Sequence, residues 1–142
     1  MTNQIPSSIQ TSTHLTVSPA ISEQQTDLLV QTIALSADDK KAADITILKI
    51  THVSYVADYL VIATGFSRTQ LRAISETIED KVAENCQKKP LRVEGRADAS
   101  WILQDYGDVI VHLFLPEERE FYNLEAFWGH AERIEFSPIQ SL

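Results

Sequence analysis

Two stripes of hydrophobic residues along the chain have the spacing of amphipathic helices. The first helix is predicted from Glu23 to Ala43, where apolar residues recur three and four positions apart: Val30, Ile33, Ala34 and Ala37. The second helix begins after Ser67, a suitable N-cap, and Gln70 three residues later completes a capping box. Its buried face is predicted to hold Leu71, Ile74, Ile78 and Val82.

Five shorter segments are rich in β-branched and apolar residues and are predicted to be strands: Ile45–Ile50, Asp58–Thr64, Leu91–Glu94, Trp101–Asp105 and Val109–Phe114. The unbroken apolar run Tyr59–Ala63 is typical of a strand that is covered on both faces, so it indicates helices on both sides of a sheet. The Tyr106-Gly107 turn between the last two strands predicts an antiparallel hairpin.

A final helix is predicted from Pro116, which suits the first helical position, to Gly129, which can end a helix. Phe121, Leu124 and Trp128 share one face of this helix and are expected to face the core or a partner. The order of elements is helix, two strands, helix, three strands, helix. This order predicts an α/β fold, with a mixed sheet of about five strands and helices on both faces.

Residues 1–22 differ from the rest of the chain because they contain no Asp, Glu, Lys or Arg and many Ser, Thr and Gln. They are expected to be a disordered Ser/Thr-rich tail, followed by a domain over residues 23–136 and a C-terminal tail over residues 137–142. The N-terminal segment lacks the basic start and apolar centre of a secretory signal. The first Lys or Arg is Lys40, too late for an Arg-rich transit peptide. A cytoplasmic location is therefore expected.

The formal net charge of −8 and the single cysteine limit the kinds of partner and site. Binding of phosphates needs a surplus of Lys and Arg on one face, so free nucleic acid is not an expected ligand. No apolar run approaches the roughly 18 residues that cross a bilayer, so no membrane partner is expected. The charge favours a basic protein partner, although it could equally serve only solubility. One cysteine, Cys86, allows neither an internal disulfide nor a Cys-based zinc site.

The usual sequence motifs of catalysis and metal binding are missing. The histidines show neither HxH nor HExxH spacing, so no metal site is expected: His14, His52, His112 and His130. The turn Ala63–Ser67 joins a strand to a helix, but it lacks both phosphate-loop patterns, and no Asp-x-Asp pair follows that could hold magnesium. There is no GxSxG motif either. We therefore expect no catalytic residue, no cofactor and no enzyme activity.

Large aromatic side chains beside acidic ones are the remaining candidates for function. Trp and Tyr are favoured anchors in protein interfaces, because they bury a large area at low entropic cost. Trp101 and Tyr106 lie in one such segment, and Tyr122 and Trp128 lie in another. Each tryptophan could equally belong to the core. His112 interrupts an apolar strand and is interpreted first as structural, then as a contact residue, and last as a catalytic base.

Three segments of the chain match one known family in unbroken order: Asp58–Ser67, Trp101–Phe114 and Arg119–Trp128. The first resembles the family's second-strand motif, the second its central signature, and the third its closing helix. Together they resemble the ribosomal silencing factors, also called iojap-like proteins, over residues 25–136. The N-terminal tail lies outside this similarity.

The resemblance implies a fold similar to that of nucleotidyltransferases but without their catalytic carboxylates. It also implies a translation repressor that binds the large ribosomal subunit through a basic protein on its intersubunit face, the fourteenth of that subunit. The bound factor would sterically block joining of the small subunit. An assembly factor for the large subunit and, with less support, a nucleotidyltransferase-related enzyme are the alternatives. A homodimer off the ribosome is left open.

The expected partner-binding surface follows from the last two of these segments. Its eight residues are Trp101, Leu103, Asp105, Tyr106, His112, Tyr122, Leu124 and Trp128. If they make contact, truncating one of them should weaken binding and leave thermal stability nearly unchanged. A structural residue would instead unfold the domain.

Overall fold

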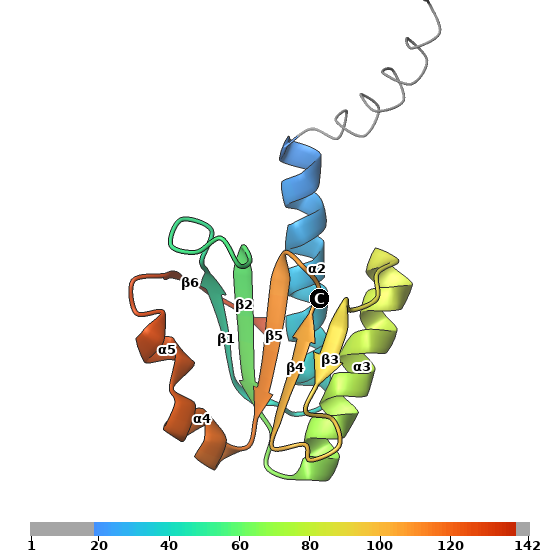
Figure 1. The fold of residues 1–142 in the computed structure, drawn as a ribbon. Helices are drawn as coiled ribbons and strands as arrows, with labels where there is room; N and C mark the ends of the chain where they lie inside the picture. The colour runs from blue at the N-terminus through green and yellow to red at the C-terminus, as the bar shows by residue number, and fades with distance from the viewer. Residues whose placement is uncertain (1–18, 139–142) are drawn as a thin grey trace, which may run out of the picture.

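A six-stranded mixed sheet forms the centre of the molecule, with helices on both faces (Figure 1). The computed structural model describes residues 19–138. The strands lie in the order β3-β4-β5-β2-β1-β6, and only the central pair β2–β5 is parallel. Their bounds are β1 Ala43–Lys49, β2 Tyr59–Thr64, β3 Arg92–Glu94, β4 Trp101–Asp105, β5 Val109–Phe114 and β6 Glu132–Ile134. The predicted α/β fold with a mixed sheet is therefore confirmed, with one strand more than expected.

Two long helices, α2 (Pro19–Asp39) and α3 (Arg68–Cys86), cover one face of the sheet (Figure 1). The hydrophobic stripes predicted for both helices are buried there against β2, β4 and β5. Helix α2 begins at Pro19, four residues before the predicted start, so residues 19–22 of the expected tail are helical. It ends at Asp39 because the chain turns at Lys41, which has φ +67. Residues 1–18 of the expected N-terminal tail and residues 139–142 of the C-terminal one lie outside the described residues.

Helix α3 starts at the cap that its sequence predicts. Ser67 Oγ accepts a hydrogen bond from the backbone N–H of Gln70 at 3.0 Å. The Gln70 side chain reaches back and accepts from the backbone N–H of Phe66 at 2.7 Å, one residue before the usual capping-box donor. One donor that the helix itself leaves without a partner is thereby satisfied, and so is the N–H of the residue before the cap.

Removing this cap should cost about 1 kcal/mol of stability. In Ser67→Ala the Gln70 N–H loses its side-chain acceptor, and losses of this kind lie near 1 kcal/mol. Urea denaturation of the variant and of wild type would measure the change. Thr69→Ala, two residues further along the exposed side of the helix, is the matched control and should stay within about 0.5 kcal/mol. Equal stabilities for Ser67→Ala and Thr69→Ala would contradict the assigned cap.

Two short helices, α4 (Pro116–Tyr122) and α5 (Leu124–Phe127), lie against the other face (Figure 1). The sequence analysis predicted one continuous helix here, and that prediction is wrong. The break lies at Asn123, which has φ +42 and ends α4 by donating its N–H to the Arg119 carbonyl. After α5 the chain returns along β1 as β6, a strand that was not predicted.

The β4–β5 hairpin has the antiparallel pairing that its turn predicts. Trp101 pairs with Phe114 and Leu103 pairs with His112. Gly107 has φ +90 in the turn, where its N–H donates to Asp105 Oδ1 at 2.8 Å. Gly95, with φ +84, packs the β3–β4 connection so closely that a Cβ would overlap the Trp101 carbonyl oxygen. The chain at Gly95 therefore leaves no room for a side chain beside the Trp101 backbone.

Candidate functional site

The face of the sheet opposite α2 and α3 is only partly covered. Leu124 and Trp128 pack from α5 and its end onto a buried cluster that includes Phe114. Beyond them, β4 turns Trp101 and Leu103 to this same face, and both side chains are only partly buried. Strand side chains alternate between faces, so these two residues lie on the opposite side from Ile102 and Gln104, which are fully buried under α3.

Aromatic rings join this strip of β4 to helix α4. The Trp101 ring lies 4.9 Å from that of Phe114 and 4.5 Å from that of Tyr122, measured between centroids. Tyr122 meets Phe121 edge to face at 4.9 Å. Tyr122 is 47% exposed and Phe121 is 79% exposed. We call the surface formed by Trp101, Leu103, Phe121 and Tyr122 the aromatic face.

His112 lies beneath Trp101 and is almost entirely buried. Its Nδ1 accepts a hydrogen bond from the Trp101 indole Nε1–H at 3.0 Å. Burial lowers the pKa of His112 to about 4, so the imidazole is neutral at physiological pH. Since Nδ1 is the acceptor, the ring proton of the neutral imidazole resides on Nε2. His112 therefore supports the aromatic face from below and offers little surface of its own to a partner.

Asp105 and Tyr106 have local structural roles. Asp105 Oδ2 accepts from Arg92 Nε at 3.4 Å, and its other oxygen holds the hairpin turn. Tyr106 is 4% exposed and lies in the core with α2 and α3, where its hydroxyl donates to Gln104 Oε1 at 3.3 Å. Burial is the largest cause that raises the Tyr106 pKa. The structure thus places Tyr106 away from the aromatic face, contrary to its predicted place in the binding surface.

The structure brings together six of the eight predicted residues on this side of the sheet as surface or supporting groups: Trp101, Leu103, His112, Tyr122, Leu124 and Trp128. Trp128 lies at the far end of α5, where it contacts Phe127 edge to face at 5.1 Å. On α4 and α5, Phe121 and Phe127 are exposed aromatic residues that the sequence analysis did not select for the binding surface. The continuous helix predicted there placed Phe121 on one face with Leu124 and Trp128, which was expected to face the core or a partner. The break at Asn123 is what separates Phe121 from that face.

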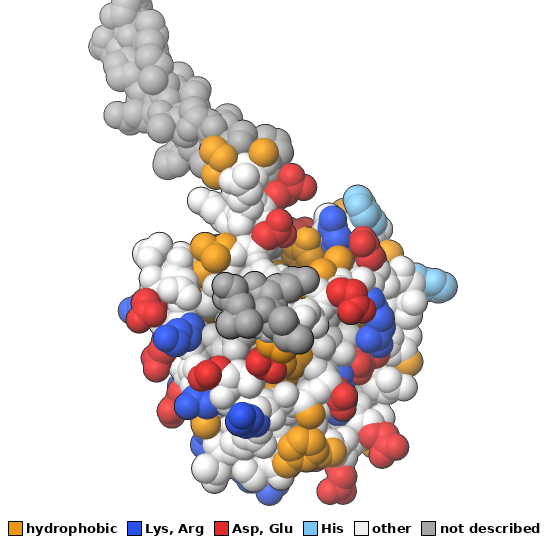
Figure 2. Space-filling model, turned by 180° about the vertical axis from the view of Figure 1, so that it is seen from behind, with side chains coloured by type: hydrophobic (Ala, Val, Ile, Leu, Met, Phe, Trp, Pro, Cys, Tyr) orange, Lys and Arg blue, Asp and Glu red, His pale blue; other side chains and the backbone are white. Residues whose placement is uncertain are grey.

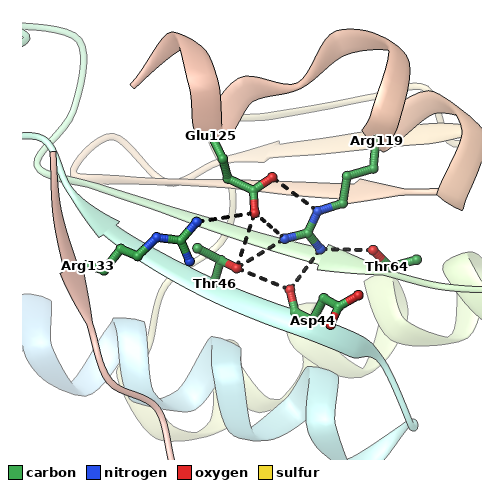
Figure 3. A network of polar contacts seen from close by, with 6 residues as sticks. All are labelled: Asp44, Thr46, Thr64, Arg119, Glu125 and Arg133. Atoms are coloured by element: carbon green, nitrogen blue, oxygen red, sulfur yellow. Dashed lines mark hydrogen bonds and ion pairs between the residues drawn. The ribbon is translucent and has the colours of Figure 1, made fainter. Parts of the chain in front are cut away.

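A polar network fastens α4 and α5 to the sheet (Figure 3). Arg119 donates to both carboxylate oxygens of Glu125, at 3.2 and 2.6 Å. The same guanidinium donates to the hydroxyls of Thr64, at 2.8 Å, and Thr46, at 3.0 Å. The Asp44 carbonyl accepts a further bond at 2.7 Å. Sequence reasoning missed this network, since its hydrogen-bonded partners lie up to 79 residues apart.

The charges of this network are mutually compensated. Burial alone would raise the pKa of Glu125, but the hydrogen bonds and charge of Arg119 outweigh it, and the pKa is lowered. Arg133 of β6 adds a second cation at 3.8 Å from the carboxylate. The network therefore holds an ionised Glu125 at the junction of α5 with β1 and β2.

Acidic side chains adjoin the aromatic face. Glu117, Glu118 and Glu120 lie on the same helix as Phe121 and Tyr122, and within residues 19–138 they form no ion pair. Elsewhere on the surface, in the view from behind, Lys and Arg lie among Asp and Glu and form no basic patch (Figure 2). The aromatic face with its acidic border suits a partner that carries positive charge.

The described part of the chain holds neither a cluster of metal ligands nor a membrane-spanning helix. There, no group of three or more His, Cys, Asp and Glu side chains is placed to hold a metal ion. None of the helices between residues 19 and 138 is long and apolar enough to cross a membrane.

Comparison with known proteins identifies a family and several close relatives. The family model described as "Ribosomal silencing factor during starvation" matches residues 22–141. The "Ribosomal silencing factor RsfS" of Bacillus subtilis is 44% identical over 104 residues, which cover 72% of this chain and 86% of that protein. "Protein Iojap, chloroplastic" of Arabidopsis thaliana is 44% identical over 103 residues, covering 72% of this chain and 42% of that protein. "Mitochondrial assembly of ribosomal large subunit protein 1" of mouse is 32% identical over 91 residues, covering 63% and 40%.

A solved structure has the same fold. The crystal structure of a Bacillus halodurans protein superposes with a TM-score of 0.66 and is 37% identical, covering 76% of this chain and 97% of that one. The family match extends over most of the chain and includes all six strands and every described helix except the start of α2. The chain therefore belongs to the ribosomal silencing factor family.

Proposed function

We propose that this chain is a translation repressor that binds the large ribosomal subunit and sterically blocks joining of the small subunit. The contact is made with a basic protein on the intersubunit face, the fourteenth of that subunit, and the protein acts in the cytoplasm. In a chain of this family, the observation that carries the proposal is the partly uncovered aromatic face with its acidic border. The mouse relative is named for the ribosomal large subunit, which supports the choice of subunit.

The chemistry of the aromatic face fits a protein partner. Trp101 and Tyr122 offer large, rigid surfaces that lose little conformational entropy on binding. The glutamates of α4, which form no ion pair within residues 19–138, attract a basic surface and speed its encounter with this face. Steric exclusion then needs no chemical step, only a firm contact and the bulk of the domain.

The position at which open α/β sheets bind small ligands is occupied here by side chains of the protein itself, which supports a mechanism without catalysis. Open α/β sheets bind ligands at the carboxyl ends of parallel strands, which here are the ends of β2 and β5. Arg119 fills this position with its bonds to Thr64 and Glu125 (Figure 3). A nucleotidyltransferase would need free carboxylates there for magnesium, but Glu125 is bound by two arginines.

Cosedimentation with separated ribosomal subunits tests the proposal. Wild type should pellet with large subunits and not with small ones, and preincubation should reduce the joined ribosomes that form when small subunits are added. Tyr122→Ala should weaken binding to large subunits about 30-fold, as expected for an interface hot spot. Its melting temperature should change by only a few degrees, because Tyr122 is 47% exposed.

Leu28→Ala is the matched control for the Tyr122 variant. Leu28 is similarly exposed, at 49%, but lies on α2, across the sheet from the aromatic face. It should bind large subunits like wild type. Failure of wild type to bind large subunits would overturn the proposal, and equal weakening by both variants would exclude the aromatic face as the contact.

A role in assembly of the large subunit is the second candidate, favoured by the name of the mouse relative. It uses the same contact but predicts association with immature large subunits and normal joining of mature ones. Away from the ribosome, we propose that a second copy of the chain can cover the aromatic face, since exposed apolar patches favour association. Sedimentation velocity of the free protein would show such a dimer, and Tyr122→Ala should shift it toward monomer.

A further inference from the structure

The indole N–H of Trp101 points into the protein and not toward a partner. Tryptophan in an interface commonly keeps its N–H available for a hydrogen bond at the wet end of the ring. In this chain the N–H is already donated to His112 Nδ1 at 3.0 Å. A partner at the aromatic face therefore meets the carbon surface of the indole, and the direction of the ring edge is set from inside.

We propose that His112 is a positioning residue, which fixes the orientation of the Trp101 ring and so prepares the aromatic face for its partner. The inference rests on the proposed function, because it assigns His112 a task in that binding. It differs from the prediction that His112 touches the partner directly. A side chain that is only 8% exposed has little surface to offer in contact.

Ring contacts alone do not set the orientation of Trp101. Its neighbours Phe114 and Tyr122 lie 4.9 and 4.5 Å away at interplanar angles of 33° and 45°. Contacts of this kind stabilise a ring through the area they bury and change little when the ring rotates. The terminal torsion angle of Trp also varies over a broad range at low energy. A hydrogen bond to one edge is directional and selects a single rotamer.

The strand register places the acceptor where the donor needs it. His112 pairs with Leu103 across the β4–β5 ladder, and Trp101 pairs with Phe114, so Trp101 and His112 are diagonal neighbours on one face. Aromatic side chains reach one another across such a diagonal. His112 also stacks at 6.0 Å on Phe114, nearly parallel at 10°, which holds the imidazole itself in place.

Two substitutions separate the acceptor of His112 from its volume. His112→Phe keeps a ring of similar size but has no acceptor, so the indole N–H loses its partner. His112→Asn is smaller but carries Oδ1 at the same number of bonds from Cα as Nδ1, so it can accept the same hydrogen bond. If His112 acts through this bond, His112→Phe should lose the fixed orientation of Trp101 and bind more weakly. His112→Asn should retain both properties.

The orientation of the ring is read from the indole N–H signals in ¹H–¹⁵N NMR spectra. The chain has two tryptophans, and the spectrum of Trp128→Phe assigns the remaining signal to Trp101. In wild type and His112→Asn, the Trp101 N–H should exchange slowly with solvent. In His112→Phe it should exchange at least about tenfold faster and shift upfield, as expected for a lost hydrogen bond.

Binding to large subunits is then measured with the same proteins. His112→Phe should bind about tenfold more weakly than wild type, and His112→Asn within about threefold of it. Trp101→Phe provides a second route, because it removes the donor of the same bond and does not depend on folding of His112→Phe. In the Trp101→Phe background, changing His112 to Asn or Phe should make no difference to affinity.

The outcomes distinguish the inference from the proposed function. If wild type binds neither subunit, the proposed function fails and the positioning role falls with it. If wild type binds and His112→Phe binds equally well despite a freed indole N–H, His112 does not position Trp101 for binding and the inference alone is overturned. Should His112→Phe not fold, a further change in affinity from His112→Asn in the Trp101→Phe background would overturn it.

Discussion

Replacing Arg119 with methionine should lower the free energy of unfolding by about 3 kcal/mol. Methionine keeps the volume of the aliphatic stem but removes every donor that Arg119 contributes to the network, and it leaves the Glu125 carboxylate without its main partner. The Arg119 side chain is 12% exposed and that of Glu125 is 21% exposed, so the pair is largely desolvated. Loss of one partner from such a pair costs several kcal/mol, because the remaining charge stays buried.

The matched control is Arg68→Met. Arg68 also bridges an acid, Asp98, but the two side chains are 56% and 72% exposed, and exposed pairs contribute at most about 1 kcal/mol. Chemical denaturation of both variants would measure the difference. The double variant Arg119→Met/Glu125→Leu should recover part of the loss, since no buried charge is then left unpaired. Equal effects of Arg68→Met and Arg119→Met would show that the network does not stabilise the packing of α4 and α5 on the sheet.

The Arg119 variant also bears on binding, because α4 carries Tyr122 and Phe121. The network joins α4 to β1 and β2, so its loss frees the helix that supplies half of the aromatic face. Affinity for large subunits should therefore fall together with stability. Tyr122→Ala, by contrast, should lower affinity with little loss of stability, and this difference separates a supporting group from a contact.

Local sequence signals were sufficient for most of the secondary structure. The capping pattern at Ser67 and Gln70 placed the start of α3, and the Tyr106-Gly107 turn gave the β4–β5 hairpin. Both features are formed by residues that are close together in the sequence, so the interactions that form them can be recognised from the sequence alone. Strand β6 was missed because Glu132–Ile134 is three residues long and only its last side chain is apolar. Its pairing with β1 is decided by tertiary position.

The candidate site was predictable in part for the same reason. Alternation along a strand places Trp101 and Leu103 on one face of β4. The sequence does not show which residues between Trp101 and Tyr106 are buried in the core. Tyr106 follows the strand at a turn and packs under the helices. Phe121 was placed on one face with Leu124 and Trp128 because helical spacing was extended through Asn123, whose left-handed backbone breaks the helix. The Arg119 network joins three strands and two helices and has no local signature.

Acidification should destabilise the protein through His112 by about 2 kcal/mol at pH 5 and about 3 kcal/mol at pH 4. In the unfolded chain this histidine titrates near its ordinary pKa of 6.5, whereas burial lowers the folded value to about 4. Between these two values the unfolded state binds a proton that the folded state does not. The stability is therefore complete above pH 6.5, falls as the pH decreases, and stops falling on this account below pH 4.

Comparison with His112→Asn isolates this contribution. The variant retains an acceptor for the Trp101 indole but cannot be protonated, so the stability difference between wild type and variant should shrink steadily from pH 6.5 to pH 4. Glu125, whose pKa is lowered, loses its contribution only below the ordinary glutamate range and does so in both proteins. Urea denaturation at intervals of half a pH unit would give the curves.

Parallel curves for the two proteins would mean that His112 titrates alike in the folded and unfolded states. That result would contradict the structure, in which a buried, neutral imidazole accepts the hydrogen bond that orients Trp101. Converging curves would instead tie two properties to one ring. Only the neutral imidazole can accept the hydrogen bond from the Trp101 indole N–H at Nδ1. Keeping the imidazole neutral in the folded state is also what lowers stability in acid. A binding face held in this way should lose its ordered indole as the pH approaches 4, which the Trp101 N–H signal would report directly.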